Sequence, residues 1–74
     1  MTNAYSTYRQ PLYVLTDEDY NAVGSIVITP QGRYLGRATD GSPLFDRKDG
    51  RDAIRAAKQR GALVVSSAWY GVTA

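Results

Sequence analysis

Two residue types that carry much of protein chemistry are missing from this sequence, which contains neither cysteine nor histidine. Without cysteine the chain has no disulfide bonds and no thiolate ligands for a metal. Without histidine it lacks the commonest general base and metal ligand. Nucleophilic sites of the serine–histidine or cysteine–histidine type are therefore excluded, and we expect a protein that is not an enzyme.

Long apolar runs are missing too. No segment approaches the roughly 18 apolar residues that a membrane-spanning helix needs. The polar N-terminus also lacks the charged and then apolar regions of a signal peptide. We therefore expect a soluble, cytoplasmic protein that does not bind a membrane.

The chain is short, at 74 residues. Only about 60% of the surface of so small a chain is buried on folding, which predicts one domain with a small core and no deep active site. Residues 1–10 are polar and contain Tyr5 and Tyr8. They are expected to form either a frayed, flexible end or a short arm whose tyrosines contact a partner.

Segments rich in β-branched residues, separated by turn residues, indicate an antiparallel sheet. The segments Pro30–Gly32 and Asp40-Gly41 predict two turns of a meander. Pro11 at the start of the first strand suits a sheet edge. Thr16 and the acids after it predict one or two helical turns ending at Gly24, and the alternative is an exposed acidic loop. The expected strands span residues 11–15, 25–29, 33–39 and 42–45.

Residues 49–60 predict the principal helix. Asp49 is favoured over Asp46 as the N-cap, because the glycine that follows Asp49 fits a helix terminus, and Gly61 suits the C-terminal cap. At 100° per residue, Ala53, Ile54 and Ala57 fall on one apolar face, so Ile54→Asp is expected to unfold the domain.

Residues 62–70 predict the last strand. Their opening apolar run suits burial on both faces or a central position in the sheet, and a loose tail is expected after residue 70. Together these elements predict an α+β fold with two layers, a mainly antiparallel sheet of three to five strands and one principal helix (about residues 49–60) packed on it.

Cofactor and metal sites have little support. The glycines do not form a phosphate-binding motif. Asp46, Asp49 and Asp52 recur every three residues, but they lack the alternating oxygen ligands and the terminal Glu of a calcium loop. We expect no cofactor and no metal, with these acids serving as caps and ion-pair partners.

Basic residues supply the main candidate binding surface. Eight of the nine Lys and Arg residues lie between positions 33 and 60, and the net charge is +2. Arginine and tyrosine side chains can hold phosphates and bases or can anchor a protein interface. The second candidate surface is acidic and suits a basic partner. The basic set comprises Arg51, Arg55 and Lys58 on one helix flank, joined by Arg33, Arg37 and Tyr34 of the hairpin and by Tyr5 and Tyr8; the acidic set comprises Asp17, Glu18, Asp19 and Tyr20.

Three functional hypotheses follow. In size and in its lack of cysteine, the chain is similar to the compact accessory proteins of phages and mobile elements, of which anti-CRISPR proteins are one group. That likeness is of general type and no motif carries it. It implies a non-enzymatic inhibitor that occludes a surface of a larger protein or protein–nucleic-acid complex. The alternative is a small nucleic-acid-binding protein, and the third hypothesis is a homo-oligomer formed through strand edges or through Trp69 and Tyr70. Whether the protein is a monomer or a homodimer stays open.

Overall fold

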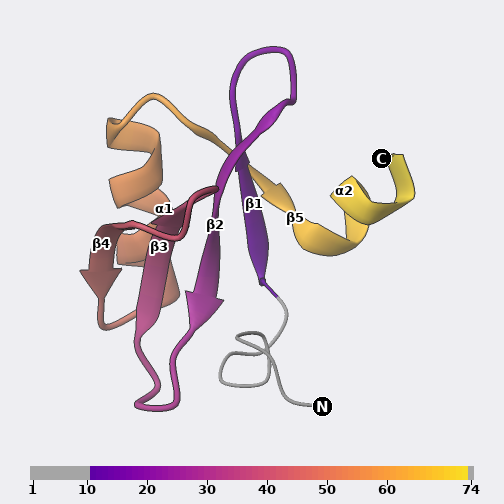
Figure 1. Cartoon of the computed structure of the whole chain (residues 1–74). Helices are drawn as coiled ribbons and strands as arrows, with labels where there is room; N and C mark the ends of the chain where they lie inside the picture. The colour runs from indigo at the N-terminus through magenta and orange to yellow at the C-terminus, as the bar shows by residue number, and fades with distance from the viewer. Residues whose placement is uncertain (1–10, 74) are drawn as a thin grey trace.

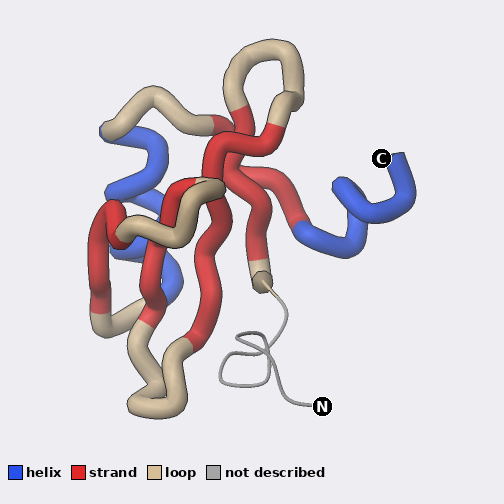
Figure 2. The backbone as a smooth tube through the Cα atoms, viewed as in Figure 1, coloured by secondary structure: helices blue, strands red, loops and turns tan. Residues whose placement is uncertain are grey.

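A computed structural model describes residues 11–73 as an antiparallel sheet of five strands with one principal helix and a short second helix (Figures 1 and 2). The α+β class predicted from the sequence is confirmed. The elements are β1 (Tyr13–Thr16), β2 (Ala22–Ile28), β3 (Tyr34–Ala38), β4 (Pro43–Arg47), α1 (Gly50–Gln59), β5 (Leu63–Ser66) and α2 (Ser67–Thr73).

The strands lie in the order β4-β3-β2-β1-β5. Strands β1 to β4 form a meander, and α1 then carries the chain across one face of the sheet, so that β5 pairs antiparallel with β1 (Figure 1). The expected positions of two strands are therefore wrong. The first strand is internal, with Pro11 two residues before β1, and the last strand is an edge. The connection through α1 decides both positions, because it places β5 beside β1. Local sequence contains no information on where this connection ends.

The two predicted meander turns are present. Gly32 and Gly41 adopt positive φ angles of 79° and 91°. A left-handed backbone of this kind is strained for residues with a β-carbon, which is why glycine occupies these corners. Hairpin β2–β3 pairs Ile26 with Gly36, and hairpin β3–β4 pairs Gly36 with Phe45.

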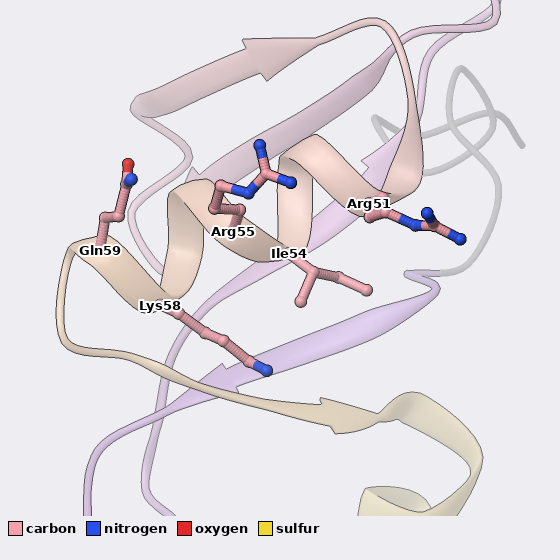
Figure 3. A pocket seen from close by; sticks show the side chains of 5 residues that line it. All are labelled: Arg51, Ile54, Arg55, Lys58 and Gln59. Atoms are coloured by element: carbon pink, nitrogen blue, oxygen red, sulfur yellow. The ribbon is translucent and has the colours of Figure 1, made fainter.

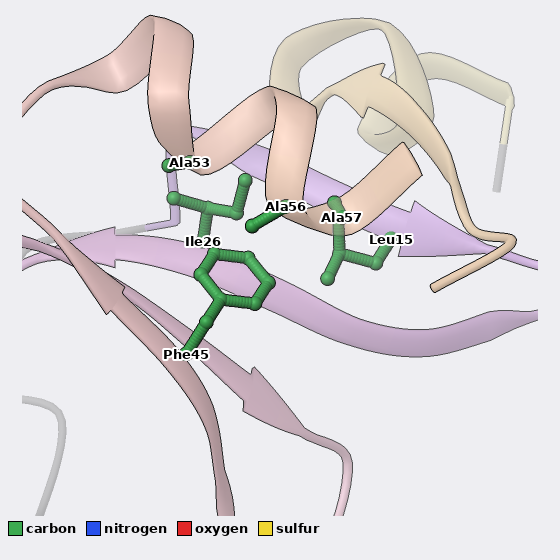
Figure 4. Packing of buried hydrophobic residues seen from close by; sticks show 6 residues of the cluster. All are labelled: Leu15, Ile26, Phe45, Ala53, Ala56 and Ala57. Carbon is green, nitrogen blue, oxygen red and sulfur yellow. The ribbon is translucent and has the colours of Figure 1, made fainter. Parts of the chain in front are cut away.

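The core lies between α1 and the sheet (Figure 4). Alanines dominate the helix side, so α1 approaches the strands closely, and Gly36 leaves the space that the ring of Phe45 fills. A β-carbon added to Gly36 would lie 2.3 Å from the Phe45 ring. The core cluster contains Leu15, Ile26 and Phe45 from the sheet and Ala53, Ala56 and Ala57 from α1.

Ile54 does not belong to this core, contrary to the sequence-based prediction. It is only partly buried, and Ala56 occupies the expected place. The buried face is centred on Ala53, with Ala56 and Ala57 on either side, and Ile54 lies about 100° around the helix from that centre. The predicted caps are confirmed. The carboxylate of Asp49 accepts the N–H of Asp52 at 2.8 Å, and Gly61 follows the C-cap residue Arg60 with a φ angle of 84°.

The segment after Thr16 forms the exposed acidic loop that the sequence offered as the alternative, and the predicted helical turns are absent from it. Strand β2 already begins at Ala22. A carboxylate that can cap a helix can equally accept N–H groups within a tight loop, and Asp17 does so here.

The C-terminal region also differs from the expectation. Strand β5 ends at Ser66, and residues 67–73 form α2 in place of a longer strand and a tail. Within residues 11–73, β1 is the one strand that pairs with β5, and this ladder ends where β1 begins. No helix within residues 11–73 has the length and apolarity that a bilayer crossing requires.

Candidate functional site

One flank of α1 carries a shallow groove. Arg51, Arg55 and Lys58 lie around Ile54, and Gln59 completes the lining of a hollow of about 420 Å³ (Figure 3). The side chains of Ile54 and Lys58 extend from α1 toward β1 and β5. We call this surface the basic groove. An aliphatic floor with a cationic rim fits a ligand that carries both apolar and acidic groups.

The positive charge of the basic groove is only partly balanced. Arg55 forms an ion pair with Asp52, with 3.3 Å between Nη1 and Oδ1, and both side chains are well exposed. Exposed pairs of this kind contribute roughly 0 to 1 kcal/mol to stability. Breaking the pair with Asp52 to bind another acidic group therefore costs Arg55 little free energy. Arg51 and Lys58 form no salt bridge with another residue of the described chain.

The hairpin arginines do not join the basic groove. Tyr34 and Gly36 face α1, and side chains alternate along a strand, so Arg33 and Arg37 lie on the opposite face of the sheet. Arg33 is also held by Asp46, with 2.7 Å between Nε and Oδ1. The predicted combination of helix flank and hairpin is therefore wrong, because the sheet separates its two parts.

Tyr34 is not part of the groove either. Tyr34 packs beneath the start of α1, where a β-carbon on Gly50 would lie 3.3 Å from its ring. Tyr5 and Tyr8 lie outside the described residues.

The acids that recur along residues 46–52 have separate structural partners. Asp46 pairs with Arg33, Asp49 caps α1, and Asp52 pairs with Arg55. Within the part of the chain that the structure describes, no group of three or more acidic side chains is placed to hold a metal ion.

Within the acidic set, Asp17 has a structural role. Its Oδ1 accepts the N–H groups of Asp19 and Asn21, each at 2.9 Å, and its Oδ2 accepts the side-chain amide of Asn21 at 3.2 Å. Hydrogen bonds from Asn21 and Asp19 stabilise the charged form and lower the pKa of the Asp17 carboxyl. Glu18 and Asp19 are exposed at the surface of this loop.

The β1–β2 loop is joined to α2 by aromatic residues, a feature that the sequence-based predictions missed. The rings of Tyr20 and Trp69 lie 5.8 Å apart between centroids, at an angle of 52°. The hydroxyl of Tyr70 donates to the carbonyl of Tyr20 at 3.1 Å. We call these three residues the aromatic clasp. The sequence showed the exposed Tyr20 and the Trp69-Tyr70 pair separately, but no local signal connected residues fifty positions apart.

A second hollow of about 500 Å³ lies between the aromatic clasp and β5. Lys58 lines both hollows, so the two hollows meet at this side chain. Tyr20, which is 54% exposed, and Leu63, which is 40% exposed, line this hollow, and Trp69, which is 49% exposed, contacts Tyr20. The second hollow is lined by Tyr20, Lys58, Gly61, Ala62, Leu63, Val64 and Val65.

No protein-family model, curated protein or solved structure gives a significant match to this chain. The functional proposal therefore rests on the geometry and chemistry of the basic groove, β5 and the aromatic clasp.

Acid is expected to open the β1–β2 loop. The folded-state pKa of Asp17 is lowered, so its contribution to stability is present above the ordinary value of about 3.9 and is lost as the pH falls through the folded-state pKa. Tyr20 would then move away from Trp69, which is the only tryptophan in the sequence. The fluorescence of Trp69 would change as a result. We expect an emission change centred below about pH 3.9.

The controls are two isosteric variants. Asp17→Asn should remove this transition. Asp40→Asn should retain it, because Asp40 has a lowered pKa from hydrogen bonds with Ser42 in a different turn. A transition that persists unchanged in Asp17→Asn would contradict the assignment.

Proposed function

We propose that this protein is a non-enzymatic binding module that attaches to a larger protein through the side formed by the basic groove, β5 and the aromatic clasp. The observation that carries the proposal is that the exposed Tyr20 and Leu63 line one hollow with Lys58, which also lines the basic groove with Arg51 and Arg55, while the exposed Trp69 contacts Tyr20. By covering a surface of its partner, such a module would act as an inhibitor by occlusion, as the small accessory proteins of phages do.

The composition of this side supports a protein interface. Tryptophan, tyrosine and arginine are the residues that most often dominate binding energy, and they act best around an apolar centre. Tyr20 and Trp69 are already in contact, and Tyr70 holds the loop through its hydroxyl. Side chains ordered before binding lose less conformational entropy when the partner arrives.

Nucleic-acid binding is supported less well. The arginines proposed for that function lie on both sides of the sheet, and Arg33 already has a carboxylate partner. Among the arginines and lysines proposed for this function, those that lie together are Arg51, Arg55 and Lys58. Few phosphate contacts give weak affinity that falls steeply with salt.

The partner can be identified by purifying the tagged protein from the cells that naturally produce it and reconstituting the complex from purified components. We expect Arg51→Glu combined with Arg55→Glu to weaken this complex at least tenfold by calorimetry, which corresponds to about 1.4 kcal/mol. The reason is that glutamates at the rim of the groove would repel the acidic groups that the arginines attract.

The matched control combines Arg47→Glu with Lys48→Glu. These side chains are also exposed, and the change in charge is the same, but neither lines the groove. The control should bind its partner with an affinity close to that of the unaltered protein. Equal losses in both double variants would contradict the proposal. So would a purified protein that binds oligonucleotides at about 50 mM salt and recovers no protein partner.

A further inference from the structure

Tyr20 has an unusual backbone conformation. Within residues 11–73 it is the one non-glycine residue with a positive φ angle, 63°. A β-carbon makes this left-handed conformation costly, and glycine is its usual occupant. Tyr20 is 54% exposed, so burial of its ring offsets little of that cost. Strained residues of this kind gather at binding and active sites, which indicates that the ring serves recognition more than stability.

The contacts of Tyr20 fix its ring before a partner binds. Its N–H donates to the carbonyl of Asp17 at 3.1 Å, and its carbonyl accepts the hydroxyl of Tyr70 at 3.1 Å. The ring itself contacts that of Trp69. A fixed aromatic surface loses little conformational entropy on binding. Tyr20 therefore forms a preorganised wall of the second hollow, which it lines.

The second hollow lies along the outward edge of β5. Leu63, Val64 and Val65 all line it. Side chains alternate between the two faces of a strand, so a hollow over one face would meet only every second residue. Among the described residues, its lining includes none from β1, the strand that pairs with β5. Tyr20 and Lys58 thus meet the whole width of β5 at this edge.

The second hollow is lined by one charged side chain, that of Lys58. The rest of its lining is apolar, apart from the hydroxyl of Tyr20 and the backbone. Lys58 forms no salt bridge with another described residue. Charge complementarity across an interface favours a negative group opposite this ammonium. A ligand for the second hollow therefore carries an apolar side chain and a carboxylate close together.

We propose that the second hollow binds the C-terminal residue of the partner protein, with an aliphatic side chain against Tyr20 and β5 and the terminal carboxylate paired with Lys58. This inference rests on the proposed function and specifies which part of the partner enters the site. A C-terminal residue carries both groups on one α-carbon. In an extended internal segment, adjacent side chains point to opposite sides, so an acidic side chain is directed away from the apolar one beside it.

The test adds peptides to the ¹⁵N-labelled full chain. The first is acetyl-Gly-Ser-Gly-Thr-Val-Leu with a free carboxylate, and the second is the same peptide with a C-terminal amide. We expect the carboxylate peptide to shift the amide signals of Tyr20 and of residues 63–65. The amide peptide should bind about tenfold more weakly, the scale of one hydrogen bond to a charged group. Equal binding of the two peptides, or no shifts at millimolar concentrations of the carboxylate peptide, would overturn the proposal.

A third peptide tests an internal acidic residue as the source of the carboxylate. It has glutamate in place of the valine and a C-terminal amide. We expect it to bind as weakly as the amide peptide, because its carboxylate and its leucine point to opposite sides. Binding as tight as that of the carboxylate peptide would overturn recognition of a C-terminus.

Lys58→Met removes the ammonium and retains a long side chain with good helix propensity. This variant should fold normally and bind the carboxylate and amide peptides equally. Lys48→Met is the matched control, because Lys48 is also exposed and lines neither hollow. The control should keep the preference for the carboxylate. A preference that survives in Lys58→Met would assign the carboxylate to another group and overturn the proposal.

Tyr20→Gly tests the aromatic wall. The variant should remain folded, with a urea midpoint close to that of the unaltered protein, because glycine relieves the left-handed strain. Loss of the ring should weaken binding of the carboxylate peptide about fivefold, within the range of one aromatic contact. A folded Tyr20→Gly variant that binds this peptide as tightly as the unaltered protein would overturn the assignment of the second hollow.

The natural partner separates failure of this inference from failure of the proposed function. A partner that loses affinity for the Arg51→Glu and Arg55→Glu double variant, but binds normally when glycine and serine are added to its own C-terminus, would overturn this inference and retain the binding module. A partner that is insensitive to that double variant would overturn the proposed function itself.

Discussion

Replacing Gly36 with alanine is expected to lower the free energy of unfolding by about 3 kcal/mol, the upper end of typical overpacking costs. The added methyl group would lie 2.3, 2.4 and 2.7 Å from three ring carbons of Phe45. The ring is 8% exposed and is enclosed by α1, so it cannot move aside without disturbing the core. Urea unfolding followed by circular dichroism measures the change.

A smaller side chain at position 45 should relieve this clash. Phe45→Leu alone is expected to destabilise the fold, because it leaves part of the core empty. Combined with Gly36→Ala, it should cost at least about 1 kcal/mol less than the sum of the two single changes. The matched control is Gly50→Ala, where the nearest atom lies 3.3 Å from the new methyl group. Additive costs at positions 36 and 45 would contradict direct contact as the cause.

Replacing Ala53 with aspartate is expected to unfold the protein. Ala53 is 0% exposed and lies in the core cluster with Leu15 and Ile26, where a carboxylate would have no cationic partner. Burial of an unpaired charge costs several kcal/mol, which is comparable with the total stability of a small domain. The far-ultraviolet circular dichroism of the variant should resemble that of an unfolded chain at 25 °C.

Ile54→Asp is the matched control on the same helix. Ile54 is partly exposed, and the new carboxylate would lie among Arg51, Arg55 and Lys58. We expect this variant to remain folded, with a loss of about 1 kcal/mol or less, the scale of helix-propensity and surface-charge effects. It should nevertheless bind the protein partner at least tenfold more weakly, because the apolar floor of the groove is lost. Unfolding of Ile54→Asp would place Ile54 in the core after all.

The variants Ala53→Asp and Ile54→Asp separate folding from binding within α1. Ala53 and its neighbours on α1 stabilise the contact with the sheet, and Val64 contributes its side chain to the same side. Ile54 and the cations beside it face outward. The same helix thus supplies the core on one face and the candidate site on the adjacent flank, at angles that differ by about 100°.

Several features were determined by local sequence. The turns at Gly32 and Gly41, the N-cap at Asp49 and the end of α1 at Gly61 depend on backbone conformations and hydrogen bonds spanning a few residues. Such short-range chemistry can be read directly from residue types. The grouping of Arg51, Arg55 and Lys58 follows from helical spacing in the same way.

The remaining features were decided only by tertiary structure. The alternation of side chains along a strand placed Arg33 and Arg37 on the same face of the sheet. Only the packing of α1 determined that this face is the one opposite the helix. The apolar run of β5 predicted burial, yet the crossover placed it at an edge. The contacts of Tyr20 with Trp69 and Tyr70 join residues about fifty positions apart. The core, the edge of β5 and the clasp thus depend on which segments meet in space. That outcome is set by the summed burial of apolar surface over the whole chain and not by any local pattern.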